Sequence, residues 1–146
     1  MKFKIIIDKT KEEEIIATVH APSALTEKIQ QLVQEFTGTD RVAAFLEDDI
    51  KMLPFAEIAC ITVQDGKTWA VDKTGKRYRL KQRLYELEEV LPASFIRINK
   101  SALANEQLIE RFAATFSGAV DAVFRGGYRE YVSRRCFAQI KRRYRL

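Results

Sequence analysis

The chain has 146 residues, 47% of them hydrophobic and 31% charged, which is the composition of a globular protein with a core of its own. No apolar run approaches the roughly 20 residues that a membrane-spanning helix needs, and residues 1–8 are too short and too charged for a signal peptide. These exclusions predict a cytoplasmic protein made of one domain, or of one small domain with an extension.

The formal net charge of +5 is unevenly distributed along the chain. Residues 1–65 carry 7 basic and 12 acidic side chains, a net charge of −5, whereas residues 66–146 carry 18 basic and 8 acidic side chains, a net charge of +10. A basic half can serve solubility alone. This separation of sign within one short chain nevertheless favours a polyanionic partner for the second half.

Residues that could support catalysis or bind a metal are few and scattered. The two cysteines, Cys60 and Cys136, lie outside any Cys-x-x-Cys or Cys/His cluster, and we expect them to be buried, reduced thiols. His20 is the only histidine, and neither Ser101 nor Ser133 has a histidine in its own segment to activate it. The sequence also lacks the common nucleotide-binding and hydrolase motifs. We therefore expect no enzymatic activity, no cofactor and no metal site.

The first 38 residues predict a small β-β-α unit. Residues 2–8 and 14–20 are rich in isoleucine and valine in the manner of two strands, with a polar turn between them. Ser23 is a suitable N-cap for a following helix, and Gly38 is a suitable stop. One apolar stripe with helical spacing lies between them: Leu25, Ile29, Leu32, Val33 and Phe36. Two strands and one helix bury little alone, so this unit should dock on the rest of the chain or on a partner.

From Asp40 onward the pattern changes to short strands separated by turn residues. The dipeptide Asp65-Gly66 is a strong hairpin signal. Residues 84–91 predict a short helix that stops at Pro92, and residues 134–144 predict a terminal helix. The expected strands are 41–47, 50–53, 58–64, 67–72, 77–80, 95–99, 108–116, 120–125 and 128–133, with Phe95 buried in the core.

Lysine and arginine gather with serine, threonine or asparagine at three places where a predicted strand ends. These places are residues 65–68, 97–101 and 131–135. Such side chains form hydrogen bonds to phosphates and to the edges of bases. A polar loop end is ordinary at any one of these places, but three of them in the basic half favour a nucleic-acid-binding surface.

Four stretches of the chain occur in an order that is typical of one known family. Residues 95–105, Phe-Ile-Arg-Ile-Asn-Lys-Ser-Ala-Leu-Ala-Asn, match an aromatic-rich strand, a His-Lys/Arg-Ser step and an apolar run that closes on Asn. Residues 53–61 match an entry into a long strand, residues 84–91 a short helix, and residues 131–141 a Val-Ser-Arg/Lys ending with a last helix. Together they resemble the LytTR family of transcription factors over roughly residues 45–144, which is more specific than one motif.

The resemblance implies both a fold and a way of binding. LytTR domains are small antiparallel sheets stacked side by side, and they reach into the major groove of DNA with loops instead of a recognition helix. We therefore expect a mainly β fold with short helices and a sequence-specific DNA-binding transcription regulator. The family's three contacting loops fall on Lys67, Lys100 and Arg135, and Asn99 stands where the family usually has His. The candidate DNA-binding residues are Lys67, Asn99, Lys100, Ser101, Ser133, Arg134 and Arg135.

The expected domains are a β-β-α extension over residues 1–44 and a LytTR-like domain over residues 45–146. Many family members carry a receiver domain before the DNA-binding part, and residues 1–44 are far too short for one. The resemblance to stand-alone members implies a regulatory membrane protein as a partner, while the apolar helix stripe suggests a homodimer. Two other interpretations stay open: a protein-interaction module with a basic face, and an RNA-binding β module, which would need exposed aromatic side chains.

Overall fold

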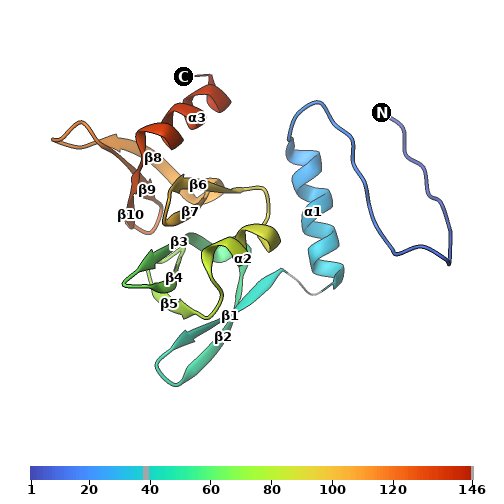
Figure 1. Cartoon of the computed structure of the whole chain (residues 1–146), viewed down its shortest axis with the longest axis horizontal. Helices are drawn as coiled ribbons and strands as arrows, with labels where there is room; N and C mark the ends of the chain where they lie inside the picture. Colours follow the sequence, from blue (N-terminus) through green and yellow to red (C-terminus); the bar gives the residue numbers. More distant parts are fainter. Residues whose placement is uncertain (38–39, 146) are drawn as a thin grey trace.

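The computed structural model describes residues 1–37 and 40–145, and in it the chain runs from helix α1 (Ala24–Thr37) into a strand-rich body (Figure 1). The body holds helices α2 (Leu84–Val90) and α3 (Arg134–Tyr144). Its strands are β1 (Arg41–Leu46), β2 (Asp49–Pro54), β3 (Ile58–Gln64), β4 (Lys67–Asp72), β5 (Arg77–Leu80), β6 (Phe95–Asn99), β7 (Ala102–Asn105), β8 (Ile109–Ala114), β9 (Val120–Phe124) and β10 (Arg129–Val132). Within the described residues, no helix is both long and apolar enough to cross a membrane.

The strands form two antiparallel sheets, which confirms the predicted mainly β fold. The larger sheet has the strand order β2-β1-β5-β4-β3-β7-β6, and the smaller sheet has the order β10-β9-β8. Most neighbours in the sheets are also neighbours in the sequence, as is usual. The pairings of β1 with β5 and of β3 with β7 are the exceptions, and they bring distant segments of the chain together.

The two faces of the larger sheet are buried under different elements. One face packs against α2 in a core that includes Ile61 and Leu87. The opposite face packs against the smaller sheet and α3 in a second core that includes Cys60, Phe124 and Ile140. Side chains alternate along a strand, so the neighbours Cys60 and Ile61 point into opposite cores. Strand β3 therefore joins both layers of the body.

Strands β3, β4, β5 and β6 and helix α3 occupy the residues that the sequence predicts. Strand β7 was not predicted, because Ala102–Asn105 has only four residues and two of them are alanines, which favour strands weakly. It forms because it is paired on both sides, with β3 and with β6. The prediction that Phe95 is buried in the core holds only in part, because the ring packs against the core that contains Leu87 but is half-buried. Phe95 begins the edge strand β6 and is only partly buried.

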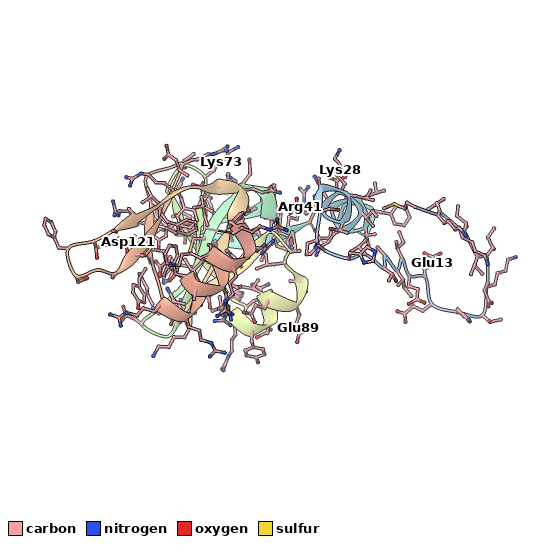
Figure 2. The ribbon with its side chains drawn as sticks, turned by 90° about the horizontal axis from the view of Figure 1, so that it is seen from above. Glu13, Lys28, Arg41, Lys73, Glu89 and Asp121 are labelled. Carbon is pink, nitrogen blue, oxygen red and sulfur yellow. The ribbon has the colours of Figure 1, made fainter. Side chains whose placement is uncertain are left out.

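The two strands predicted for the extension do not form. Residues 2–8 and 14–20 have no regular secondary structure, and they lie on the far side of α1 from the sheets, as Glu13 shows in Figure 2. An isolated pair of strands is marginally stable in water. The described chain also leaves their apolar side chains uncovered, since Phe3 and Ile7 are 88% and 86% exposed.

Helix α1 forms as predicted, and it docks on the body through polar groups. The Gln34 Nε2 atom donates to the carbonyl of Val90 over 3.1 Å, and Gln30 Oε1 accepts from the N–H of Ala93 over 3.0 Å. Among the side chains that the structure describes, none of α1 belongs to either apolar core. The helix thus turns polar residues toward the body and much of its apolar stripe toward solvent.

The boundary between the extension and the body differs from the prediction. Strand β1 begins at Arg41 and pairs along its length with β2. A division between residues 44 and 45 would cut this strand, so the body begins near residue 40. The predicted helix stop at Gly38 lies outside the described residues.

Candidate nucleic-acid interface

Three loops of the body lie side by side at the ends of strands from both sheets. They are the β3–β4 turn, the β6–β7 turn and the β10–α3 junction. The N–H of Val63 donates to the carbonyl of Ser101 over 2.9 Å, which joins the first loop to the second. The N–H of Ser133 donates to the carbonyl of Ile98 over 2.8 Å, which joins the second loop to the third. The three basic segments found in the sequence therefore form one edge, called the loop edge below.

The first loop is the two-residue turn Asp65-Gly66 at the end of the β3–β4 hairpin. Its residues have φ angles of 53° and 73°, a left-handed pair that matches the twist of a two-residue hairpin and that glycine adopts without strain. Gln64 and Lys67 pair across the foot of the turn. Lys67 is exposed there, so its ammonium group faces solvent at the loop edge.

The second loop is the β6–β7 turn, where Lys100 is exposed and Ser101 is half-buried. Arg97 Nη1 donates to the carbonyl of Lys100 over 2.7 Å, and Arg97 Nε forms an ion pair with Glu88. Arg97 thus pairs with a carboxylate of its own chain at the surface and fixes the backbone of the turn. Lys100 carries the positive charge outward.

Asn99 also lies in the second loop, but its side chain is only 7% exposed. Its Oδ1 accepts from the N–H of Ser101 over 2.7 Å, and its Nδ2 donates to the carbonyl of Tyr131 over 2.7 Å. The other six candidate residues lie at the loop edge with exposed or half-buried side chains. Asn99 is buried behind them.

The third loop is the start of helix α3. Ser133 is its N-cap, and the hydroxyl oxygen accepts from the N–H of Cys136 over 3.2 Å. Arg134 and Arg135 follow in the first turn, and both are exposed. The first N–H groups of a helix and its dipole attract anions, so two arginines here reinforce a positive end.

A polar cluster lies between the two sheets behind the loops. Glu130 of β10 accepts from the Tyr128 hydroxyl over 2.5 Å, and its other oxygen accepts from Thr62 and Asn99 over 3.4 Å each. Burial raises the pKa of the Tyr128 hydroxyl well above its ordinary value, and the hydrogen bond to Glu130 raises it further. The negative charge of Glu130 is thus held by donors of the protein, away from the loop edge.

The sequence patterns did not reveal a further basic group, which consists of Arg77 and Arg79 beside the ring of Trp69. Arg77 of β5 lies over the ring of Trp69, 4.8 Å from its centroid, and its Nη2 donates to Gln64 over 2.7 Å. Arg79 lies over the same ring at 5.9 Å. The signal in the sequence was the alternation Arg77-Tyr78-Arg79 on a strand, which points two arginines to one face.

The fold and the loop edge define a class of protein: a β-rich nucleic-acid-binding domain that presents basic loops. The model of the LytTr DNA-binding domain family matches residues 48–145. The chain belongs to this family, and it is a DNA-binding transcription regulator. The match also includes all seven candidate residues.

Known proteins similar to this chain agree with that assignment. Two Staphylococcus aureus proteins, from strains MSSA476 and NCTC 8325 / PS 47, are 28% and 27% identical to it over 146 aligned positions, and each alignment covers 98% of this chain and 97% of theirs. Each is named an uncharacterized HTH-type transcriptional regulator. A solved LytTr DNA-binding domain from Bacillus cereus has a TM-score of 0.65 at 22% identity, and covers 73% of this chain and 98% of its own. The extension is thus part of the likeness to the full-length relatives.

Proposed function

We propose that the chain reads a specific sequence in double-stranded DNA with its three adjacent loops. The observation that carries this proposal is the pair of backbone hydrogen bonds, from Val63 to Ser101 and from Ser133 to Ile98, which align the loops along one edge. Each loop contributes an exposed basic side chain, namely Lys67, Lys100 and Arg134 with Arg135. A row of separate loops can follow a groove, as a single recognition helix does in other DNA-binding proteins.

The side chains of the loop edge suit two tasks. Lys67 and Lys100 are point charges on flexible stems, which suit phosphates, and phosphate contacts supply affinity that falls with salt. Arg134 and Arg135 carry planar guanidinium groups. Each such group can donate two hydrogen bonds to the edge of one guanine, which supplies sequence preference. The hydroxyl groups of Ser101 and Ser133 complete the edge as donors to phosphate or base.

The experiment that tests this function is selection of binding sites from a random pool of DNA duplexes. We expect one enriched motif, whose affinity exceeds that of a random duplex by about a thousandfold or more and falls steeply with salt. RNA and single-stranded DNA should compete poorly. A pool that returns no motif, or an RNA that competes fully, would favour the protein-interaction or the RNA-binding alternative. A regulator of this kind acts where the chromosome is, and we assign it to the cytoplasm.

The extension, in our proposal, joins two copies of the chain. Eight large apolar side chains in it are between 64% and 88% exposed: Phe3, Ile5, Ile6, Ile7, Ile15, Ile16, Leu32 and Phe36. So many exposed large apolar side chains in one segment mark an interaction site. Residues 1–40 carry 5 basic and 7 acidic groups, a net charge of −2, so DNA is a poor occupant for it.

A second copy is the occupant we favour, because each copy would cover the other's stripe with the same apolar surface. The extension also meets the body near Val90 and Ala93, away from the loop edge. Two joined chains could therefore present both loop edges to one DNA duplex. A membrane protein that restrains the regulator would be the other occupant, and it would bind in competition with self-association.

A further inference from the structure

Asn99 was a candidate DNA-contacting residue, but its burial and its hydrogen bonds assign it another role. Both ends of its amide are engaged within the protein. The Oδ1 atom accepts a hydrogen bond from the N–H of Ser101 over 2.7 Å, and the Nδ2 atom donates one to the carbonyl of Tyr131 over 2.7 Å. Ser101 belongs to the second loop, and Tyr131 lies two residues before the third. One side chain thus spans the two loops.

We propose that Asn99 is a positioning residue that fixes the second and third loops relative to each other, so that Lys100 and Arg135 meet the DNA together. This inference rests on the proposed function of the loop edge. The bond to Tyr131 joins the larger sheet to the smaller one, because Asn99 ends β6 while Tyr131 is in β10. The bond to Ser101 holds the turn that carries Lys100.

Neighbouring contacts support a fixed orientation for this amide. Its Nδ2 group has two hydrogens, and the Glu130 carboxylate lies 3.4 Å away as a second acceptor. Glu130 is itself held by Thr62 and by Tyr128. The amide oxygen therefore faces Ser101 and the amide nitrogen faces Glu130 and Tyr131, and the reverse orientation would place two oxygens together.

The chain contains a matched control in Asn105, at the other end of strand β7. Asn105 is 1% exposed, its Oδ1 accepts from the N–H two residues ahead, in Gln107, over 3.1 Å, and its Nδ2 donates to the carbonyl of Ile58 over 3.0 Å. The chemistry is the same as at Asn99, but the bonds of Asn105 lie at the opposite end of the hairpin from the loop edge. Loss of either amide should cost the fold a similar amount.

The first test compares Asn99→Ala and Asn105→Ala in the full chain. The probes are the duplex recovered by selection and a random duplex of equal length. We expect Asn99→Ala to lower the ratio of the two affinities by about tenfold, the order of one base contact, while Asn105→Ala leaves the ratio unchanged. Asn99→Asp keeps the acceptor for Ser101 but puts a carboxylate against Glu130 and Tyr131, so it should lower the ratio as well. Equal ratios for the Asn99 and Asn105 variants would overturn the proposal.

The second test separates positioning from direct contact with DNA. If Asn99 acts through the third loop, the double variant Asn99→Ala, Arg135→Ala should lose less affinity than the product of the single losses, whereas independent contacts would multiply. In the protein without DNA, hydrogen exchange measured by NMR should be faster at the Ser101 amide in Asn99→Ala, and an unchanged rate would overturn the tether.

These readouts also distinguish this proposal from the one it rests on. If Lys100→Ala and Arg135→Ala both leave DNA binding unchanged, the loop edge is not the interface and the proposed function fails. The Ser101 exchange rate would still report whether Asn99 holds the turn.

Discussion

Arg97 Nη1 donates to the backbone carbonyl of Lys100 over 2.7 Å, so one basic side chain holds in place the turn that presents another. Arg97 is in turn paired with Glu88, at the end of α2. The carboxylate of Glu88 largely neutralises the positive charge of Arg97, so Arg97 attracts a DNA phosphate less than an unpaired arginine would. The two neighbours therefore have different roles, although both are basic residues of one short segment.

The first prediction concerns Lys100. Its exposure at the loop edge leads us to expect a phosphate contact, so Lys100→Ala should weaken binding to all duplexes and lower the slope of log affinity against log salt by about 1. Binding would be measured over a series of salt concentrations. Lys28→Ala is the control, because Lys28 is exposed on α1, outside the strand-rich body (Figure 2). The same slope in both variants would remove Lys100 from the interface.

The second prediction concerns Arg135. Its place in the first turn of α3, beside the N-cap Ser133, suits a contact with a base edge. Arg135→Ala should cost about 1–3 kcal/mol of specific binding and relax the preference at one base position of the selected motif. Arg142→Ala, an equal change in charge near the other end of the same helix, should lower affinity slightly and leave the preference intact. A motif that Arg135→Ala leaves unaltered would contradict the assignment.

The sequence predicted those parts of the molecule whose structure is local. Strands β3 and β4 follow from β-branched and aromatic runs on either side of Asp65-Gly66, and α3 follows from Phe137 and Ile140 among the basic residues of 134–144. The order of strands in the larger sheet depends on the β3–β7 pairing, which joins residues far apart in the chain and leaves no periodic trace. The two strands predicted in the extension failed for a related reason, because a strand pattern forms a strand only where a partner edge is present.

The candidate site was predicted in the same uneven way. Charge and position at a strand end singled out Lys67, Lys100 and Arg135, which lie at the loop edge in the structure, and their contact with DNA stays a prediction. Asn99 has the same polar character in the sequence, but its role depends on the Tyr131 carbonyl, which only the packing of the two sheets brings near. Arg77 was passed over because the Trp69 ring beneath it belongs to a different strand.

The third prediction concerns the core between the two sheets. Phe124 is fully buried there, whereas Phe95 is only partly buried. Phe124→Ala should lower the free energy of unfolding by about 3–5 kcal/mol, and Phe95→Ala should lower it by less, because a partly exposed ring leaves a smaller cavity. Urea unfolding of both variants would measure the difference. An equal loss would show that β6 packs more tightly than its exposure indicates.

The fourth prediction concerns pH. The pKa of Tyr128 is raised by burial and by its bond to Glu130, whereas in the unfolded chain it returns to about 10. Folding thus favours the protonated hydroxyl, and this contribution to stability is complete below pH 10 and is lost as the pH rises above it. Tyr128→Phe should cost about 1 kcal/mol at neutral pH, for the lost hydrogen bond, and should reduce the fall in stability above pH 10.

The matched control for this prediction is Tyr85→Phe, since Tyr85 is 61% exposed. That variant should keep both the neutral stability and the alkaline fall of the parent chain. Tyr144 also has a raised pKa, through burial and Glu106, so part of the alkaline fall should remain in Tyr128→Phe. Denaturant unfolding at pH 7 and at several values above pH 10 would measure these slopes, and identical slopes for the two variants would rule out Tyr128 as the source.

The last prediction concerns the extension. Leu32 and Phe36 are 64% and 86% exposed on α1 and contribute little to a single chain. If their stripe joins two copies, the intact chain should sediment as a dimer, and the double variant Leu32→Ser, Phe36→Ser should sediment as a monomer with an unchanged unfolding transition of the body. Lys28→Ser is the control on the same helix and should remain dimeric. A parent chain that is monomeric at all concentrations would contradict self-association, and a double variant that unfolds would show that the stripe supports its own chain.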